Sequence, residues 1–197
     1  IVNFMMVGAA PSLDKVVALT KDGWEDTRYG EYQVFTKSFP KMKDLPSIGG
    51  YHDDILNAEK ILSLHPDVLL IGRTQYAENS QRISTFEKAG IKVIVLDYHA
   101  MTTANHTLST EILGKLLGRE KIAEAQNKTY KEALDHVYST IAKLPQDQVG
   151  TKVYMETASK GLARYGNSYN KDVLWGAILK NIKAANLAEN SPQLYMA

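Results

Sequence analysis

Residues 46–73 read PSIGGYHDDILNAEKILSLHPDVLLIGR, and this stretch decides the fold. Gly49-Gly50 gives the backbone the freedom for a sharp turn or for close approach to a ligand. The apolar residues between positions 55 and 64 are spaced as on one face of a helix, which Pro66 ends. Val68–Ile71 is a continuous apolar run, as expected of a parallel strand covered on both faces. Arg73 should therefore emerge at the carboxyl end of that strand, where open α/β sheets bind ligands.

The chain on either side repeats this alternation of strands and helices. Residues 79–90 have a helical pattern, and the apolar run 91–96 predicts a second buried strand that ends at Asp97-Tyr98-His99. Strands alternating with helices predict an α/β fold with a parallel sheet and right-handed crossovers. Arg73 and Tyr98-His99 should then lie along one edge of the sheet. Ile1–Val7 is expected to form a first buried strand, followed by a small-residue loop and a helix capped by Ser12.

The second half of the chain is dominated by one long helical pattern. Residues 102–118 predict a helix, and residues 119–144 follow with almost no breaker and one continuous apolar stripe. About 25 residues at about 1.5 Å each span nearly 40 Å. A helix of that length in so short a chain favours a role in joining two lobes. We divide the chain into an amino-terminal α/β lobe (1–118), a connecting helix (119–144) and the start of a carboxyl-terminal α/β lobe (145–197).

Two segments are less regular. Residues 24–43 are rich in aromatic side chains without a clean period, so they either cover the sheet or line a cleft. The third part carries one predicted strand (151–156), a glycine-rich loop (159–170) and one amphipathic helix (171–186). One strand and one helix are too few for an independent lobe, because an isolated strand cannot satisfy its own hydrogen bonds. We therefore expect the second lobe to be incomplete in this chain.

The composition excludes several classes of protein. Of 197 residues, 44% are hydrophobic and 23% are charged, which is ordinary for a soluble globular protein. The net charge of +1 argues against a nucleic-acid partner. No run approaches the ~18 apolar residues of a membrane span. The absence of cysteine excludes disulfides, thiolate metal sites and a cysteine nucleophile. No positively charged leader precedes the first apolar residues, so a secretory signal was either removed or never present.

The chain has no P-loop, nucleophile elbow, H-E-x-x-H or G-x-G-x-x-G motif. The five histidines are scattered. His65 lies at a predicted helix end, where a structural role is expected, and His136 lies on the exposed side of the long helix. His99 follows a strand end, where a neutral imidazole could complete an iron or nickel coordination sphere left open by a chelator; the alternative is an ordinary surface residue. Tyr98 either binds Fe(III) as a phenolate, stacks on a ligand or simply packs.

The pattern P-x-I-G-G-Y followed by L-N-x-E-x-I-L-x-L-x-P-D-V-L-L-I-G resembles the solute-binding proteins of ABC importers for ferric siderophores, cobalamin and haem. The resemblance continues through residues 91–97, the helical stretch after them and Arg164-Tyr165-Gly166, and so covers most of the chain. It implies two α/β lobes with mainly parallel sheets, joined by one long helix. It also implies a secreted protein, either periplasmic or lipid-anchored on the outer face of the cytoplasmic membrane.

Several side chains suit ligand binding. The arginines at positions 73 and 164 can make bidentate, charge-assisted hydrogen bonds to the oxygens of an anionic ligand. The resemblance places both in the ligand cleft, whereas the alternative is surface salt bridging. Tyr165, Tyr51 and His52 are further candidates. By the resemblance, Glu59 docks onto an arginine pocket of the permease; from the sequence alone it would be an exposed helix carboxylate.

The sequence and the resemblance together predict a binding protein that captures a metal chelate between two lobes and delivers it to an ABC permease without catalysing a reaction. A ferric siderophore is the first choice, a nickel or other metal chelate held through His99 is the second, and haem and cobalamin follow. A rival of another class is an α/β enzyme that uses His99 as a base, with Asp97 as its neighbour. A carrier of bare zinc or manganese is a third alternative. No cofactor is expected, and the protein is expected to be a monomer.

Overall fold

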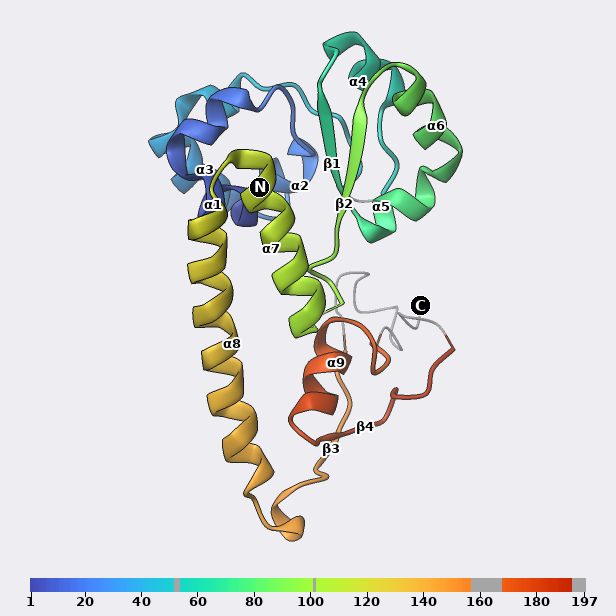
Figure 1. Ribbon diagram of the computed structural model, residues 1–197. Coiled ribbons are helices and arrows are strands. Elements are labelled where there is room, and N and C mark those ends of the chain that lie inside the picture. Colours follow the sequence, from blue (N-terminus) through green and yellow to red (C-terminus); the bar gives the residue numbers. More distant parts are fainter. Residues whose placement is uncertain (52–53, 101, 157–167, 193–197) are drawn as a thin grey trace. The chain divides into compact units, whose positions relative to one another are not determined.

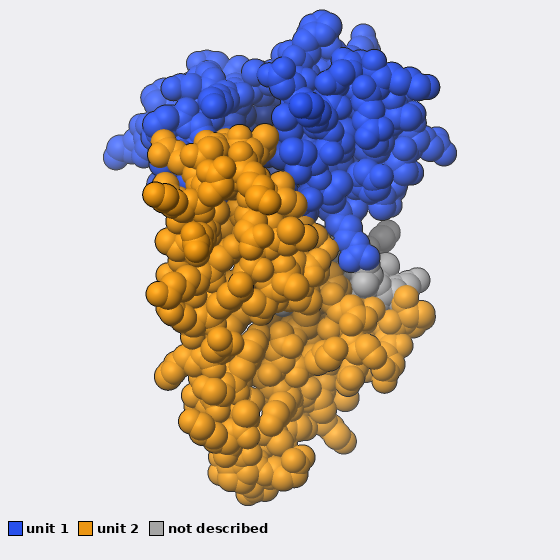
Figure 2. All heavy atoms as spheres, viewed as in Figure 1, with its two compact units in different colours: residues 1–96 blue, residues 97–197 orange. Residues whose placement is uncertain are grey.

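The computed structural model describes residues 1–51, 54–100, 102–156 and 168–192. The chain divides into two compact units, Ile1–Leu96 and Asp97–Ala197, coloured separately in Figure 2. Helices surround small parallel sheets, of which the described residues form one in each unit. The α/β class predicted from the sequence is confirmed.

The sheet of the first unit pairs β1 (Val68–Gly72) with β2 (Lys92–Leu96) in parallel, as Figure 1 shows. Two helices, α5 (Arg73–Glu78) and α6 (Ser80–Lys88), connect the strands. The main core gathers the buried apolar residues of these elements and of the turn before them: Ile48, Leu56, Ile61, Leu69, Ile71, Ile83, Phe86 and Ile91. In β1 buried positions alternate with partly exposed ones, so only one face of the strand is fully covered.

The helix predicted before the first strand is α4 (Ala58–Leu64). It begins at Asn57, whose side chain accepts a hydrogen bond from the Lys60 amide at 2.9 Å, the usual role of an N-cap residue. It ends at His65, which has the left-handed conformation with a φ of 47°. His65 therefore lies at the helix end, as the sequence predicted.

The first residues of the chain have a different structure from the one predicted from the sequence. Ile1–Val7 was expected to be a strand, but α1 (Val2–Ser12) is helical, with a kink at Ala9. Short apolar runs have the same pattern in a strand and in a helix, so periodicity cannot separate them. The hydroxyl of Ser12 donates to the carbonyl of Ala9 at 2.6 Å instead of capping a new helix. Only a short 3-10 helix, η1 (Leu13–Lys15), follows.

The aromatic segment also folds into helices. It contains α2 (Lys21–Glu25), α3 (Tyr29–Ser38) and the 3-10 helix η2 (Pro40–Lys43), each too short to produce a clear period in the sequence. The rings of Trp24 and Phe35 meet edge to face at 5.4 Å. A second small core forms here around the buried residues Leu19, Met42 and Leu45.

The second unit is built on two packed helices, α7 (Thr103–Leu117) and α8 (Glu120–Ala142). They are joined at Gly118, which takes the left-handed conformation with a φ of 63°. At Gly114 a Cβ would lie only 2.6 Å from the Cβ of Ala123, so the two backbones approach closely. This packing joins α7 to α8, and both helices belong to the unit that begins at Asp97. The three lobe segments predicted from the sequence stay a prediction.

The helix predicted over residues 119–144 is α8, whose 23 residues extend about 35 Å. After η3 (Gln146–Gln148), the described residues pair β3 (Lys152–Val153) in parallel with β4 (Ala185–Asn186). The helix expected over 171–186 is shorter, because α9 (Leu174–Asn181) gives way to that strand. In the described part of the chain, no helix combines the length and the apolar character that a membrane crossing needs.

Candidate ligand site

The carboxyl ends of β1 and β2 lie at one edge of the sheet. Gly72 pairs with Leu96, and Arg73 and Asp97 follow these residues directly in the chain. The two strand ends therefore share an edge, as the sequence analysis expected. Arg73 begins α5 and is exposed. This is the position at which parallel sheets bind ligands.

The side chain of Gln75 ties the glycine turn to the end of β1. Its amide nitrogen donates to the carbonyl of Gly50 at 2.7 Å, and its amide oxygen accepts from the Gly72 amide at 3.1 Å. Gly50 has a φ of 84°, and a Cβ there would lie 2.6 Å from a methyl carbon of Leu56. The turn therefore requires glycine for both its backbone conformation and its packing.

Asn79 fixes the far side of the same loop. Its side chain is 1% exposed; its oxygen accepts from the Leu56 amide at 3.0 Å, and its nitrogen donates to the Asp54 carbonyl at 2.6 Å. The hydroxyl of Thr74 donates to the Asp54 carboxylate at 3.2 Å. Helix α5 and the residue after it thus hold both ends of the loop that carries Tyr51.

Tyr51 contacts residues from much earlier in the chain. Its backbone amide donates to the carboxylate of Asp22, 29 positions before it, at 3.3 Å. Its side chain lies near Arg28 and raises the pKa of that guanidinium, despite an opposing effect of burial. Tyr51 was predicted from its motif, whereas Asp22 and Arg28 belong to no motif and were not predicted.

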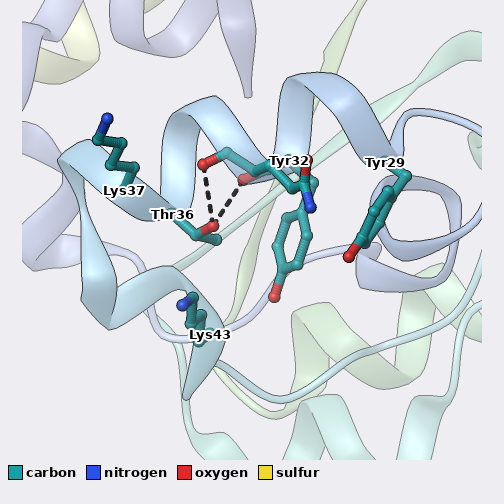
Figure 3. Close-up of a pocket in the computed structure, with 6 residues that line it drawn as sticks. Tyr29, Tyr32, Thr36, Lys37 and Lys43 are labelled. Atoms are coloured by element: carbon teal, nitrogen blue, oxygen red, sulfur yellow. Dashed lines mark hydrogen bonds between the residues drawn. The ribbon is translucent and has the colours of Figure 1, made fainter.

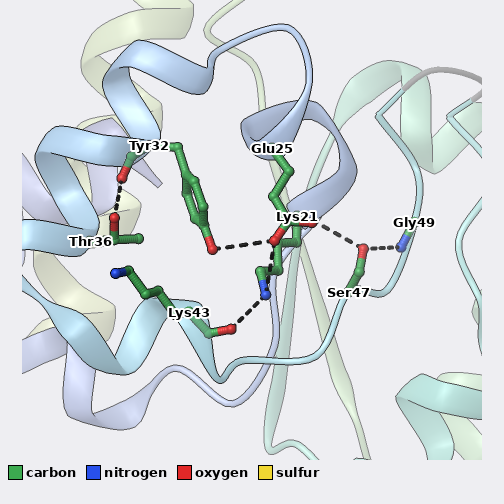
Figure 4. Close-up of polar contacts among 7 residues, drawn as sticks. All are labelled: Lys21, Glu25, Tyr32, Thr36, Lys43, Ser47 and Gly49. Carbon is green, nitrogen blue, oxygen red and sulfur yellow. Dashed lines mark hydrogen bonds and ion pairs between the residues drawn. The ribbon is translucent and has the colours of Figure 1, made fainter.

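A second set of polar contacts, drawn in Figure 4, ties α2 and η2 to the glycine turn. The ammonium of Lys21 pairs with Glu25 at 3.1 Å and donates to the Lys43 carbonyl at 2.6 Å. The amides of Lys21 and Gly49 both donate to the hydroxyl of Ser47, at 3.2 and 3.3 Å. The helices of the aromatic segment therefore help to position the turn.

In the second unit, Tyr98 packs among aromatic neighbours. Its hydroxyl lies 3.2 Å from that of Thr110, and burial raises its pKa. The ring of His106 meets Tyr98 edge to face at 5.2 Å and stacks on Tyr130 at 5.1 Å. A nitrogen of His106 is 2.8 Å from the Tyr98 carbonyl, and burial lowers the pKa of this histidine. These contacts favour packing over a phenolate role for Tyr98.

His99 is exposed, and its carbonyl accepts from the Leu174 amide at 3.0 Å. The neighbouring Asp97 carboxylate accepts from the Ala100 amide at 3.1 Å and from the Asn105 side chain at 2.9 Å. Both of its oxygens are therefore engaged in holding the backbone that follows the strand. The described residues contain no group of three or more side chains placed to hold a metal ion.

The remaining predicted residues are distributed as follows. Glu59 is exposed in the first turn of α4, and His136 is exposed on α8. His52, Arg164 and Tyr165 lie outside the described residues. The roles predicted for all these residues remain predictions.

A pocket of about 340 Å³ lies on α3 and η2, as Figure 3 shows. Its lining consists of Tyr29, Tyr32, Gln33, Thr36, Lys37 and Lys43. None of these is a predicted site residue. The hydroxyl of Thr36 is already bonded to the Tyr32 carbonyl at 2.8 Å.

Known proteins resemble this chain over most of its length. A Bacillus subtilis relative, an uncharacterized ABC transporter substrate-binding lipoprotein called YvrC, is 25% identical over 152 residues, which cover 77% of this chain and 46% of the relative. The crystal structure of the TroA-like periplasmic binding protein FepB from Veillonella parvula superposes with a TM-score of 0.82 and 24% identity, covering 98% of this chain and 55% of that one.

The periplasmic vitamin B12 binding protein BtuF of Vibrio cholerae gives a TM-score of 0.61 and 15% identity, covering 84% of this chain and 58% of that protein. The chain thus spans about half the length of the relatives it matches. The structural likenesses agree with the parallel sheet and helices described above. The family model of the periplasmic binding proteins matches residues 12–194, and by this match the chain belongs to the periplasmic binding protein family.

Proposed function

We propose that the chain is part of the substrate-binding protein of an ABC importer and that its ligand is a metal chelate, with a ferric siderophore as the first choice. The observation that carries this proposal is the edge of the first unit's sheet, where Arg73 follows β1 and Gln75 ties the glycine turn to the same strand end. Family membership supports it, as does the name of the Bacillus subtilis relative.

The chemistry of this edge favours an anionic ligand. Arg73 is exposed there, and Arg28 lies near Tyr51, which follows the glycine turn and raises the pKa of Arg28. Guanidinium groups make strong charge-assisted hydrogen bonds to carboxylate and catecholate oxygens. His99 remains the proposed ligand for a metal whose chelator leaves a coordination position open.

Chelates of other chemistry are the alternatives. A nickel or other metal chelate would use His99 in the same way, whereas haem or cobalamin would make less use of the arginines. The protein would bind and release its ligand unchanged, without catalysis. The engagement of Asp97 with Ala100 and Asn105 gives no support to the rival enzyme that pairs this carboxylate with His99.

Delivery of the ligand completes the proposal. We place the protein outside the cytoplasm, either in the periplasm or lipid-anchored on the outer face of the membrane, as the lipoprotein name of the relative supports. Glu59 is exposed in the first turn of α4, where a permease could reach it. We propose that this carboxylate docks onto the permease.

Ligand titration tests the proposal. The intact protein is titrated with a ferric tris-catecholate, a nickel–histidine complex, haem and cobalamin, and tryptophan fluorescence is followed. We expect sub-micromolar binding of one chelate. Loss of a charge-assisted hydrogen bond costs about 1.5–3 kcal/mol, so Arg73→Ala should weaken binding at least about tenfold.

The matched control is Arg119→Ala, which removes the same charge from the exposed turn between α7 and α8. This variant should bind the chelate as the wild type does. Failure of all four ligands to bind would overturn the metal-chelate proposal. An equal loss of affinity in both arginine variants would show that net charge, rather than the sheet edge, controls binding.

A further inference from the structure

The structure assigns a positioning role to Gly23, Asp22 and Arg28: we propose that they hold Tyr51 in the orientation in which its side chain contacts an anionic, oxygen-rich chelate. The proposal rests on the function proposed above and names residues that determine specificity for that ligand. None of the three was singled out by the sequence.

The central observation is the space at Gly23. A Cβ added to this residue would overlap Cγ and both Cδ atoms of Tyr51. Real Cβ atoms do not approach other atoms so closely, and Cγ is the base of the ring rather than its flexible end. The Tyr51 side chain therefore occupies its position because residue 23 has no side chain.

The local helix gives no other reason for glycine. Gly23 lies inside α2, is buried, and does not have a positive φ. At such a position alanine is the better helix former, because glycine loses more backbone freedom on folding. The glycine is therefore explained by the ring that packs on it, and not by the backbone of α2.

The backbone and the side chain of Tyr51 are held separately. Its amide donates to Asp22 at 3.3 Å, which fixes the chain at the residue after the glycine turn. Arg28 lies close enough to the Tyr51 side chain for Tyr51 to raise its pKa. Arg28 also pairs with Glu31 at 3.3 Å, and both of these charged side chains are about half exposed. An exposed ion pair of this kind contributes little to stability, so it does not prevent the guanidinium from binding a ligand.

The arrangement selects a class of ligand. A tyrosine hydroxyl and a guanidinium held together present several hydrogen-bond donors and one positive charge. Such a pair suits anionic oxygens, as in catecholates and carboxylates. A change that moves the Tyr51 ring away from Arg28 should therefore weaken binding of a ferric tris-catecholate more than binding of uncharged ligands.

A double-mutant cycle tests this role. Gly23→Ala, Tyr51→Ala and the double variant of the intact protein are titrated with a ferric tris-catecholate, and their thermal unfolding is followed without ligand. We expect Gly23→Ala to weaken binding at least about tenfold when Tyr51 is present and by less than about twofold in the Tyr51→Ala background. Tyr51→Phe, which keeps the ring and removes the hydroxyl that faces a ligand in this proposal, should show an intermediate loss.

The matched control is Gly30→Ala, because Gly30 lies in α3 with no atom within 4 Å of an added Cβ. It should leave the affinity unchanged and raise the melting temperature slightly. Gly23→Ala should lower the melting temperature with Tyr51 present and raise it in the Tyr51→Ala background.

Affinity and melting temperature together distinguish failure of the proposed function from failure of the positioning role. If the wild type binds no chelate, the proposed function fails, while the melting temperatures still judge the contact between Gly23 and Tyr51. If Gly23→Ala has the same effect on melting in both backgrounds, the positioning role is wrong. If melting shows the coupling but affinity for the tris-catecholate does not change, the contact is structural only and the specificity role is overturned.

Discussion

Replacement of Asn79 by alanine should be among the most damaging single changes in the first unit. The side chain is 1% exposed. Its oxygen accepts from the Leu56 amide at 3.0 Å and from Arg82 at 3.1 Å, and its nitrogen donates to the carbonyls of Asp54 and Gln75 at 2.6 and 2.7 Å. Asn79→Ala removes all of these bonds, and the Leu56 amide among their partners is buried away from water.

The expected cost follows from these partners. The carbonyl of Gln75 also accepts from the Asn79 backbone amide at 3.0 Å and so keeps a partner. The buried Leu56 amide is left unpaired, which costs about 1–3 kcal/mol, and the partly buried Asp54 carbonyl loses one bond worth about 1 kcal/mol. We therefore expect Asn79→Ala to lower the free energy of unfolding by about 2–4 kcal/mol. At about 2–4 °C per kcal/mol for a chain of this size, the melting temperature should fall by roughly 10 °C.

The assay is urea and thermal unfolding followed by far-UV circular dichroism. Asn57→Ala is the matched control, because it removes the same atoms from an exposed N-cap whose oxygen accepts from the Lys60 amide at 2.9 Å. Water can replace that bond, so the control should cost only about 1 kcal/mol. If Asn79→Ala is no more destabilising than Asn57→Ala, the buried network does not hold the loop and the reasoning is refuted.

Three further changes test other parts of the structure. Gly114→Ala places a Cβ 2.6 Å from that of Ala123. Overpacking should cost about 1–3 kcal/mol and helix propensity should return about 1, so thermal unfolding should show that the free energy of unfolding falls by about 1 kcal/mol. Failure of Ala123→Gly to restore the stability would contradict the close packing. Gly118 has a φ of 63°, so Gly118→Ala should lower the free energy of unfolding by about 1–2 kcal/mol, whereas Gly30→Ala should not lower it. Equal melting temperatures of these two variants would exclude backbone strain at position 118. Burial lowers the pKa of His106, so the stability from its neutral form is fully present above the unfolded pKa of about 6.5 and is lost as the pH falls from there through the lower folded pKa. His106→Gln should therefore flatten the loss of stability in urea between about pH 7 and 5, and parallel curves would count against this role.

The sequence by itself was sufficient where the signals were local. The helix that ends before Pro66 and the long helix after Gly118 were predicted because breakers and periodicity act within a few residues, whereas the cap at Asn57 was not predicted. The shared edge of β1 and β2 also followed, because a strand, a helical crossover and a second strand form a parallel pair. The pattern of residues alone was therefore enough to place Arg73 at a strand end.

Local signals were ambiguous elsewhere. Ile1–Val7 is apolar without alternation, and such a run fits a helix as well as a strand, so the expected strand was wrong. The aromatic segment forms helices of at most ten residues, which are too short to show a period. Their stability comes from packing, such as the contact of Trp24 with Phe35, rather than from propensity.

Only the tertiary structure decided what surrounds the candidate site residues. Tyr51 was named from its motif, but its partners Asp22, Gly23 and Arg28 come from a part of the chain whose contact with the glycine turn no pattern encodes. His106 similarly belongs to no motif, yet folding stacks it on an aromatic ring and buries it enough to lower its pKa. The physical reason is that periodicity reports which face of an element is buried, whereas the neighbours on that face depend on how distant segments pack.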